Sequence, residues 1–186
     1  MAWERERDRV LALGARRRLH QQVQTFPGLH LAELARGLEM DPNHAKYHLD
    51  RLERSGLVTS RHEGGFLLYF PKEETALGLR DAVGANDKAL LAALRRPVPL
   101  HIALLLMERG RITHAQLLED VGVAHGTLHY HLKRMEDSAI LTSVKEGRER
   151  WYTLADRDTV ERLLMKYRPP NALVEGFLDA WEGLQL

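Results

Sequence analysis

The chain contains, at residues 47–53, the stretch Tyr47-His48-Leu49-Asp50-Arg51-Leu52-Glu53, which returns later as Tyr130-His131-Leu132-Lys133-Arg134-Met135-Glu136. We call the separation between positions 47 and 130 the repeat offset. At this same offset further identical residues align without a gap, among them Ala32 with Ala115, Thr59 with Thr142, and Tyr69 with Tyr152. Two copies are too few for a solenoid. The sequence therefore predicts a duplicated domain.

Each copy predicts three helices around this stretch. Pro27 and Gly28 end the first helix of the first copy, and Gly110 ends the first helix of the second. At the start of the second helix, Thr113 and Gln116 have the spacing of a capping box. The third helix carries an apolar stripe at i, i+3, i+4 and i+7, formed by Leu128, His131, Leu132 and Met135.

A tight turn precedes the third helix in both copies. In the second copy this turn contains Gly122, the residue type best able to adopt a left-handed conformation. In the first copy Asp41 is placed as an N-cap, with Pro42 at the first helical position. The two short helices and their turn therefore predict a helix-turn-helix.

Strand-like runs follow the third helix in each copy. Residues 140–154 contain two such runs around a polar turn at 145–149, and residues 57–70 contain two around 62–65. Three helices plus a terminal hairpin form a winged helix. The predicted fold is mainly α with small β-hairpin wings: two tandem winged helix-turn-helix domains plus C-terminal helices.

The expected domain boundaries follow from this pattern. Residues 72–86 have no sustained hydrophobic period and include Gly78 and Gly84, so we expect a linker there. The expected divisions are a first winged-helix domain at 1–71, the linker at 72–86, a second winged-helix domain at 87–155, and a C-terminal helical segment at 156–186.

The C-terminal segment has more apolar residues than a winged helix needs. Leu163, Leu164 and Tyr167 precede the break at Pro169-Pro170, and a second helical stripe follows it, formed by Leu173, Val174, Phe177, Leu178, Trp181 and Leu184. This stripe is either a lid on the core of the second domain or an oligomer contact. The second alternative predicts a homodimer through the C-terminal segment.

The composition narrows the function classes. Of the 186 residues 44% are hydrophobic, so the chain can bury sizeable cores, and none is a cysteine, so thiol catalysis and disulfides are excluded. With 27 basic against 26 acidic residues, any surface that binds nucleic acid must be local. We find no run of about 18 apolar residues and no secretory signal. We therefore expect a cytoplasmic protein without a membrane partner.

The residues opposite the apolar stripe of the third helix are candidates for contact with DNA, because the major groove admits one helix and displays a distinct pattern for each base pair. In the second domain these candidates are Gly126, Thr127, His129, Tyr130, Lys133 and Arg134. In the first domain they are Asn43, His44, Lys46, Tyr47 and Arg51. The first domain also has Asp50, and DNA phosphates would repel its carboxylate. We therefore expect the second domain to read DNA better.

The wings point to the same difference between the domains. Lys145, Arg148 and Arg150 of the second wing can reach phosphates. The first wing offers only Arg61 and His62, next to the acidic Glu63. Phosphate contacts are therefore expected mainly from the second domain.

Several segments resemble a known family. Residues 27–36, with Gly56-Leu57-Val58 and Tyr69-Phe70-Pro71, resemble the first domain of archaeal tandem winged-helix transcriptional regulators. His125-Gly126-Thr127-Leu128 and Trp151-Tyr152-Thr153-Leu154 resemble their second domain, which is akin to ArsR and MarR relatives. Lys166-Tyr167-Arg168-Pro169 resembles their C-terminal end. The resemblance implies DNA binding and transcription regulation.

Histidines raise the alternative of a metal site. His44 with His48, and His125 with His129, are i, i+4 pairs that could share a helix face and bind Zn or Ni. No full ligand set is visible, and His48 and His131 border the core stripe as packing residues. We therefore expect no metal and no other cofactor. The sequence contains no phosphate-cradling loop and no nucleophile elbow, so we do not expect an enzyme.

The function predicted from these features is that of a double-stranded DNA-binding transcriptional regulator, which reads promoter DNA through its recognition helices and wings. One alternative is a winged-helix protein-interaction scaffold in the transcription machinery. Another is a ligand-responsive regulator. The salt dependence of duplex binding separates the DNA-binding function from the scaffold, because contacts with phosphates release counterions.

Overall fold

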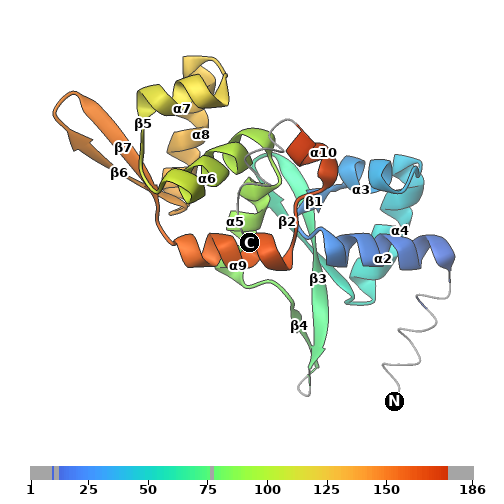
Figure 1. The fold of residues 1–186 in the computed structure, drawn as a ribbon. Coiled ribbons are helices and arrows are strands. Elements are labelled where there is room, and N and C mark those ends of the chain that lie inside the picture. The colour runs from blue at the N-terminus through green and yellow to red at the C-terminus, as the bar shows by residue number, and fades with distance from the viewer. Residues whose placement is uncertain (1–9, 11–12, 76–77, 176–186) are drawn as a thin grey trace. The chain divides into compact units, whose positions relative to one another are not determined.

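The computed structural model describes residue 10 and residues 13–75 and 78–175 of the chain. The chain divides into two compact units, residues 1–88 and residues 89–186, which Figure 1 shows with their helices and strands labelled. Each unit contains a helix-turn-helix followed by an antiparallel hairpin. The predicted fold class, two tandem winged helix-turn-helix domains, is confirmed.

The first unit consists of three helices and a small sheet. Its elements are α2 (Gly14–Thr25), β1 (Leu29–His30), α3 (Leu31–Gly37), α4 (Pro42–Arg54), β2 (Val58–Glu63), β3 (Phe66–Thr75) and β4 (Gly78–Asp81). The strands are antiparallel in the order β1-β3-β2, and Val58 pairs with Pro71 at one end of the hairpin and Glu63 with Phe66 at the other. The strand β4 pairs with the C-terminal part of β3.

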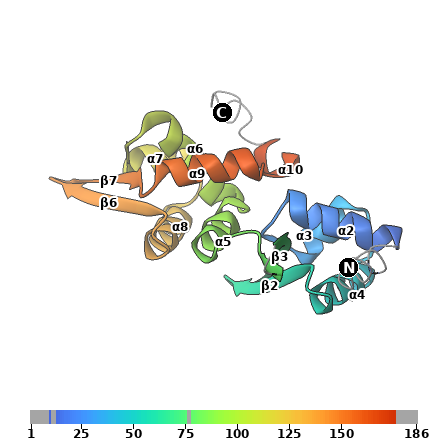
Figure 2. The ribbon, with the colours of Figure 1, turned by 90° about the horizontal axis from the view of Figure 1, so that it is seen from below.

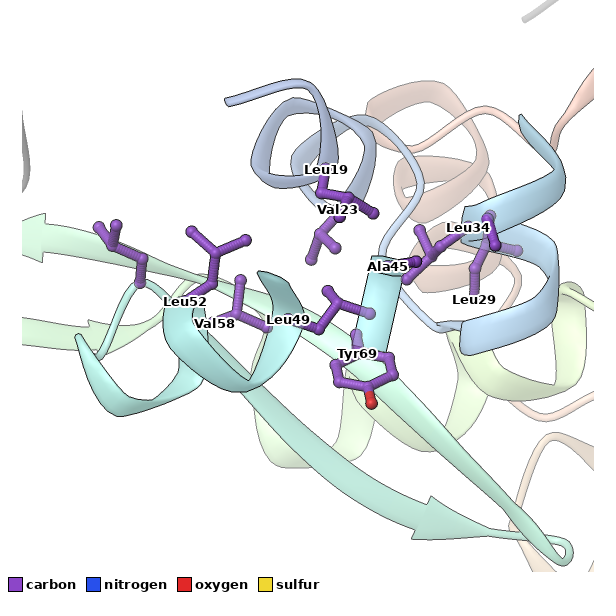
Figure 3. Close-up of a cluster of buried hydrophobic side chains, with 11 residues drawn as sticks. Leu19, Val23, Leu29, Leu34, Ala45, Leu49, Leu52, Val58 and Tyr69 are labelled. Atoms are coloured by element: carbon purple, nitrogen blue, oxygen red, sulfur yellow. The ribbon is translucent and has the colours of Figure 1, made fainter. Parts of the chain in front are cut away.

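The core of the first unit lies between its helices and this sheet. Figure 3 shows Leu19 and Val23 of α2 facing Leu49 of α4, with Tyr69 of the sheet beside them. Leu19, Val23 and Leu49 have no exposed surface. Burial of each such side chain stabilises the unit by about 1.5 to 3 kcal/mol. The packing of α4 through one side leaves its other side exposed.

The second unit repeats this arrangement. Its elements are α6 (Pro97–Arg109), β5 (Ile112–Thr113), α7 (His114–Val121), α8 (His125–Asp137), β6 (Leu141–Glu146) and β7 (Glu149–Leu154), preceded by α5 (Ala85–Leu94) and followed by α9 (Arg157–Lys166) and α10 (Asn171–Val174). The repeat offset relates both bounds of α8 to those of α4, and both bounds of β6 to those of β2. The two units therefore share one architecture, and the strand order β5-β7-β6 matches β1-β3-β2.

Local sequence signals account for the ends of the helices. The Asp41 side chain accepts hydrogen bonds from the backbone N–H groups of Asn43 and His44, so Asp41 caps α4 as predicted. Thr113 and Gln116 form the predicted capping box of α7. Gly122 ends α7 with φ of +68°, in the left-handed region.

The segment 72–86, expected to be a linker, contains regular structure. The strand β3 continues to Thr75, β4 pairs with it, and α5 begins at Ala85. The pairing satisfies backbone groups of the two strands without requiring an apolar period in the side chains. The sequence therefore carried no hydrophobic signal for this hairpin. The two-residue strands β1 and β5 were missed for a related reason, since two residues cannot display a period.

One buried arginine connects the ends of α5 and α9. Arg95 as a whole is 3% exposed, and its guanidinium donates to the backbone carbonyl oxygens of Tyr167 and Arg168, at 3.1 Å each. Cationic groups at this position satisfy the carbonyl groups that a helix leaves unpaired at its C-terminus. The side chains of Leu163, Leu164 and Tyr167, on the first part of the predicted C-terminal stripe, are buried. Phe177, Leu178, Trp181 and Leu184 lie outside the described residues.

No single helix in the described part of the chain has the length and apolar character needed to cross a membrane. The helices α5 and α6, which Figure 2 labels, would satisfy that test only as a pair. The pair is bent by 101°.

Two glycines at the start of the recognition region provide a matched test of backbone conformation. We expect Gly122→Ala to destabilise the second unit by about 1 kcal/mol, because its φ of +68° is unfavourable for any residue with a Cβ. Gly126→Ala, inside α8 and with open space where the added Cβ would lie, should instead stabilise the second unit by up to about 1 kcal/mol. Urea unfolding of both variants measures the difference. Equal effects of the two substitutions would contradict the assigned turn.

Candidate nucleic-acid interface

The exposed face of α8 contains most of the predicted contact residues of the second domain. Leu128, Leu132 and Met135 are buried, and this burial fixes which side of α8 faces outward. The outward residues are Gly126, Thr127, His129, Tyr130 and Lys133, all exposed, and Arg134, which is half-buried. One helix face therefore presents hydroxyl, imidazole and cationic donors together.

Tyr130 and Arg134 act as one unit on this face. A guanidinium nitrogen of Arg134 donates to the Tyr130 hydroxyl at 2.8 Å, and this hydrogen bond lowers the pKa of Tyr130. The equivalent residues of α4, Tyr47 and Arg51, are also paired, with the guanidinium carbon 5.7 Å from the ring centroid. The pairing restricts the side chains of both pairs, so each third helix presents a tyrosine and an arginine in a defined arrangement.

The exposed face of α4 carries less free positive charge. Asn43, His44, Lys46, Tyr47 and Arg51 are all exposed, as predicted for contact residues. The Lys46 ammonium, however, lies 3.3 Å from a carboxylate oxygen of Asp50. An exposed ion pair of this kind adds little to stability, but it offsets the charge that Lys46 would offer to a phosphate.

The histidines of α4 contact each other. The Nε2 atoms of His44 and His48 lie 2.9 Å apart, so one ring donates to the other. His48 is buried, and burial lowers its pKa, with further lowering by His44 and Arg16. The predicted packing role of His48 agrees with this environment. In the described part of the chain, no group of three or more histidines and carboxylates is placed to hold a metal ion.

The wing of the second domain is hydrogen-bonded to α8. The Ser143 hydroxyl of β6 donates to a carboxylate oxygen of Glu136, and Arg150 of β7 donates to the Ser143 oxygen at 2.9 Å. In the first domain, Ser60 donates to Glu53 through both its backbone N–H, at 3.1 Å, and its hydroxyl, at 2.6 Å. Only the second domain extends this connection to an arginine of the wing. Sequence reasoning missed the role of these residues, although both Glu and Ser recur at the repeat offset.

A groove of about 750 Å³ lies between α8 and this wing. It brings together four of the predicted contact residues: His129, Lys133, Arg148 and Arg150. His114 of α7 and His125 of α8 also line it, and neither was among the predicted contact residues. Lys145 is exposed on β6, in register with Arg150, and does not line the groove. The groove therefore brings basic, acidic and imidazole groups together beside the recognition helix.

Comparison with protein families agrees with this duplicated architecture. Residues 14–79 match a family described as an N-terminal HTH domain, and residues 100–138 match a family described as winged helix-turn-helix DNA-binding. The chain is a tandem winged helix-turn-helix protein.

Similarities to individual proteins cover parts of this tandem winged helix-turn-helix protein. An uncharacterized HTH-type transcriptional regulator of Methanocaldococcus jannaschii is 25% identical over 142 residues, which are 76% of this chain. The chain spans about a third, 34%, of that relative's length. The structure of HlyU from Vibrio cholerae has a TM-score of 0.41 and 22% identity, covering 45% of this chain and 92% of HlyU. The structure of the transcriptional repressor BigR from Xylella fastidiosa has a TM-score of 0.38 and 26% identity, covering 50% of this chain and 84% of BigR.

Acid should destabilise the folded protein. Burial lowers the pKa of four imidazoles: His48, His101, His114 and His131. Because their pKa values in the unfolded chain are higher, about 6.5, the unfolded state binds protons more readily. Each imidazole therefore contributes stability that is present above about pH 6.5 and is lost as the pH falls.

We expect the unfolding equilibrium constant to rise below this pH by up to about tenfold per pH unit for each imidazole. Urea unfolding at a series of pH values measures this change, and His101→Gln should reduce it. A midpoint that stays level or rises on acidification would show that these imidazoles are not protonated more easily on unfolding.

Proposed function

We propose that the protein binds double-stranded DNA and regulates transcription, and that its second domain supplies most of the affinity. The observation that carries this proposal is that Lys133 of α8 and Arg148 and Arg150 of the wing line one groove beside the exposed face of α8, together with three carboxylates. The matched winged helix-turn-helix DNA-binding family covers all of α8 and supports the proposal. The relative named as an HTH-type transcriptional regulator supports the regulatory part.

The recognition helix α8 would enter the major groove, where base edges are distinguishable. Gly126 and Thr127 lie at its N-terminal end and give the helix a small profile there. Tyr130 and Lys133 would face base edges or phosphates further along the helix. The wing would contact the adjacent phosphates through Lys145 and Arg148, which are exposed.

The first domain would contribute less to DNA affinity. On α4 the charge of Lys46 is offset by Asp50. On the wing, the Arg61 guanidinium lies 3.4 Å from a carboxylate oxygen of Glu63 and also donates to the carbonyl of Ala85. Both cations therefore already have acidic neighbours within their own domain.

Charge reversal tests this difference between the domains. We expect Lys133→Glu and Arg148→Glu each to weaken binding by about 1 kcal/mol or more per lost contact and to reduce the salt slope by about 1. Lys46→Glu and Arg61→Glu change the net charge of the first domain by the same amount. These two variants should lose less binding free energy than the two variants of the second domain. Asp50→Lys should strengthen non-specific binding. Titration of a labelled duplex at several salt concentrations measures all five variants.

The same titration distinguishes the alternatives. Equal losses from the variants of both domains would show that both third helices read DNA. An absence of loss from every variant, or a salt-independent affinity, would favour a winged-helix scaffold that binds protein. Selection of sites from random duplexes would then identify the promoter sequence that the protein prefers.

We also propose a homodimer formed through the C-terminal segment. The proposal rests on the apolar spacing of Leu173, Phe177, Leu178 and Trp181 beyond the second winged helix. Light scattering of the full chain should give about twice its 21.3 kDa mass, and deletion of residues 170–186 should halve that value. The point variant Leu178→Asp, made in the full-length chain, should lower the mass in the same way as the deletion. A particle with the mass of a single chain, in the presence and in the absence of residues 170–186, would rule out this dimer.

A further inference from the structure

Three imidazoles line the groove in the second domain. His114 is the first residue of α7, and its ring centroid lies 4.9 Å from that of His125, the first residue of α8. His129 lies one turn further along α8 and lines the same groove. Together they are not placed to hold a metal ion. We therefore consider the charge that these imidazoles carry when they are protonated.

The cluster is not required by the fold. The equivalent positions of the first domain, related by the repeat offset, are occupied by Leu31, Pro42 and Lys46. The first domain nevertheless forms the same helices and the same hairpin. The histidines therefore distinguish the second copy from the first at positions where the architecture tolerates very different residues.

The other charged groups of the groove cancel one another. Its cations are Lys133, Arg148 and Arg150. Its carboxylates are Glu136 and Asp137 of α8 and Glu149 of β7. Three positive and three negative groups give no formal net charge. The remaining titratable group is the Tyr152 phenol, whose pKa is raised by burial, so it is neutral. Each proton taken up by an imidazole therefore adds one net positive charge to the groove.

We infer that this groove is a phosphate site, and that its occupation is coupled to proton uptake by the imidazole cluster around His114. The affinity for a phosphate-bearing ligand would then rise as the pH falls. This inference rests on the proposed function where the phosphate belongs to the DNA backbone. A free phosphate ion offers the same kind of anionic oxygen atoms, and the second arm of the experiment distinguishes it from the backbone phosphate.

The direction of the coupling follows from electrostatics. In the free protein, burial lowers the pKa of His114, and the neighbouring His125, His129 and Arg150 lower it further. His114 is therefore neutral near pH 7. A phosphate placed in the groove supplies the opposite charge and favours the protonated imidazole. By linkage, the affinity for the phosphate-bearing ligand rises by up to about tenfold for each pH unit of acidification and for each proton taken up on binding.

The experiment measures binding of a labelled duplex of mixed sequence by the full chain, at constant ionic strength, between about pH 8 and about pH 6, where imidazoles titrate. We expect wild-type affinity to increase by about tenfold or more over this interval if at least one proton is bound. The triple variant His114→Gln, His125→Gln, His129→Gln should lose this increase. His101→Gln lies in the same domain but outside the groove and should retain it.

Folding is monitored by circular dichroism at every pH, because acid also destabilises the protein. Where the triple variant does not fold, His129→Gln alone replaces it, since His129 is exposed and its loss leaves the core intact. The single variant should reduce the increase in affinity. An unchanged pH dependence in a folded variant would overturn the inference.

A second arm omits DNA and follows the imidazole signals by NMR while inorganic phosphate replaces chloride at equal ionic strength. A shift of the His114 titration toward higher pH with inorganic phosphate supports a site that also accepts the free anion. A pH-dependent duplex affinity without such a shift supports a site for the backbone phosphate alone. A duplex affinity that does not change with pH, together with an unchanged His114 titration, overturns the inference. Absence of duplex binding at every pH would contradict the proposed function instead, and the inorganic phosphate arm would still decide the phosphate site.

Discussion

The third helix of each domain can bury only one of its sides, and this constraint determines what the rest of the surface presents. In α8 the buried side consists of Leu128, Leu132 and Met135. Burial of three such side chains is worth several kcal/mol, roughly 1.5 to 3 kcal/mol each, far more than any exposed contact of the helix. The rotation of α8 is therefore fixed by the core, and Tyr130 and Lys133 face outward as a consequence.

Duplication allowed the two outward faces to differ while the buried faces stayed alike. The stripe of Ala45, Leu49 and Leu52 in α4 packs its helix in the same manner as the stripe of α8. Substitutions on the outward face cost little folding energy, because exposed polar groups lose few contacts. Asp50 and its counterpart Lys133 therefore have opposite charges within the same architecture. The two copies therefore differ in the charge of this exposed position, while the energy of folding is expected to differ little between them.

The sequence predicted the parts of the fold that depend on periodic burial and on specific local conformations. The repeat located both third helices, and Asp41, Thr113 and Gly122 marked helix ends that the structure confirms. The hairpin of β3 and β4 was not predicted, because its pairing depends on backbone groups that are the same in every residue. The exposed face of α8 followed from helical spacing. The position of His114 beside His125 did not, because it depends on how α7 crosses α8 in three dimensions.

The hydrogen bonds between helix and wing explain how such a groove can keep its shape. Glu136 accepts from Ser143, and Ser143 accepts from Arg150, so a cation of the wing is held at a defined position relative to α8. Hydrogen bonds to charged groups are stronger than neutral ones, typically by about a factor of two. A flexible arginine would lose side-chain entropy on meeting a phosphate, whereas one already held loses less. The first domain has the Glu–Ser connection without the arginine. This difference is a physical reason, independent of net charge, to propose tighter polyanion binding by the second domain.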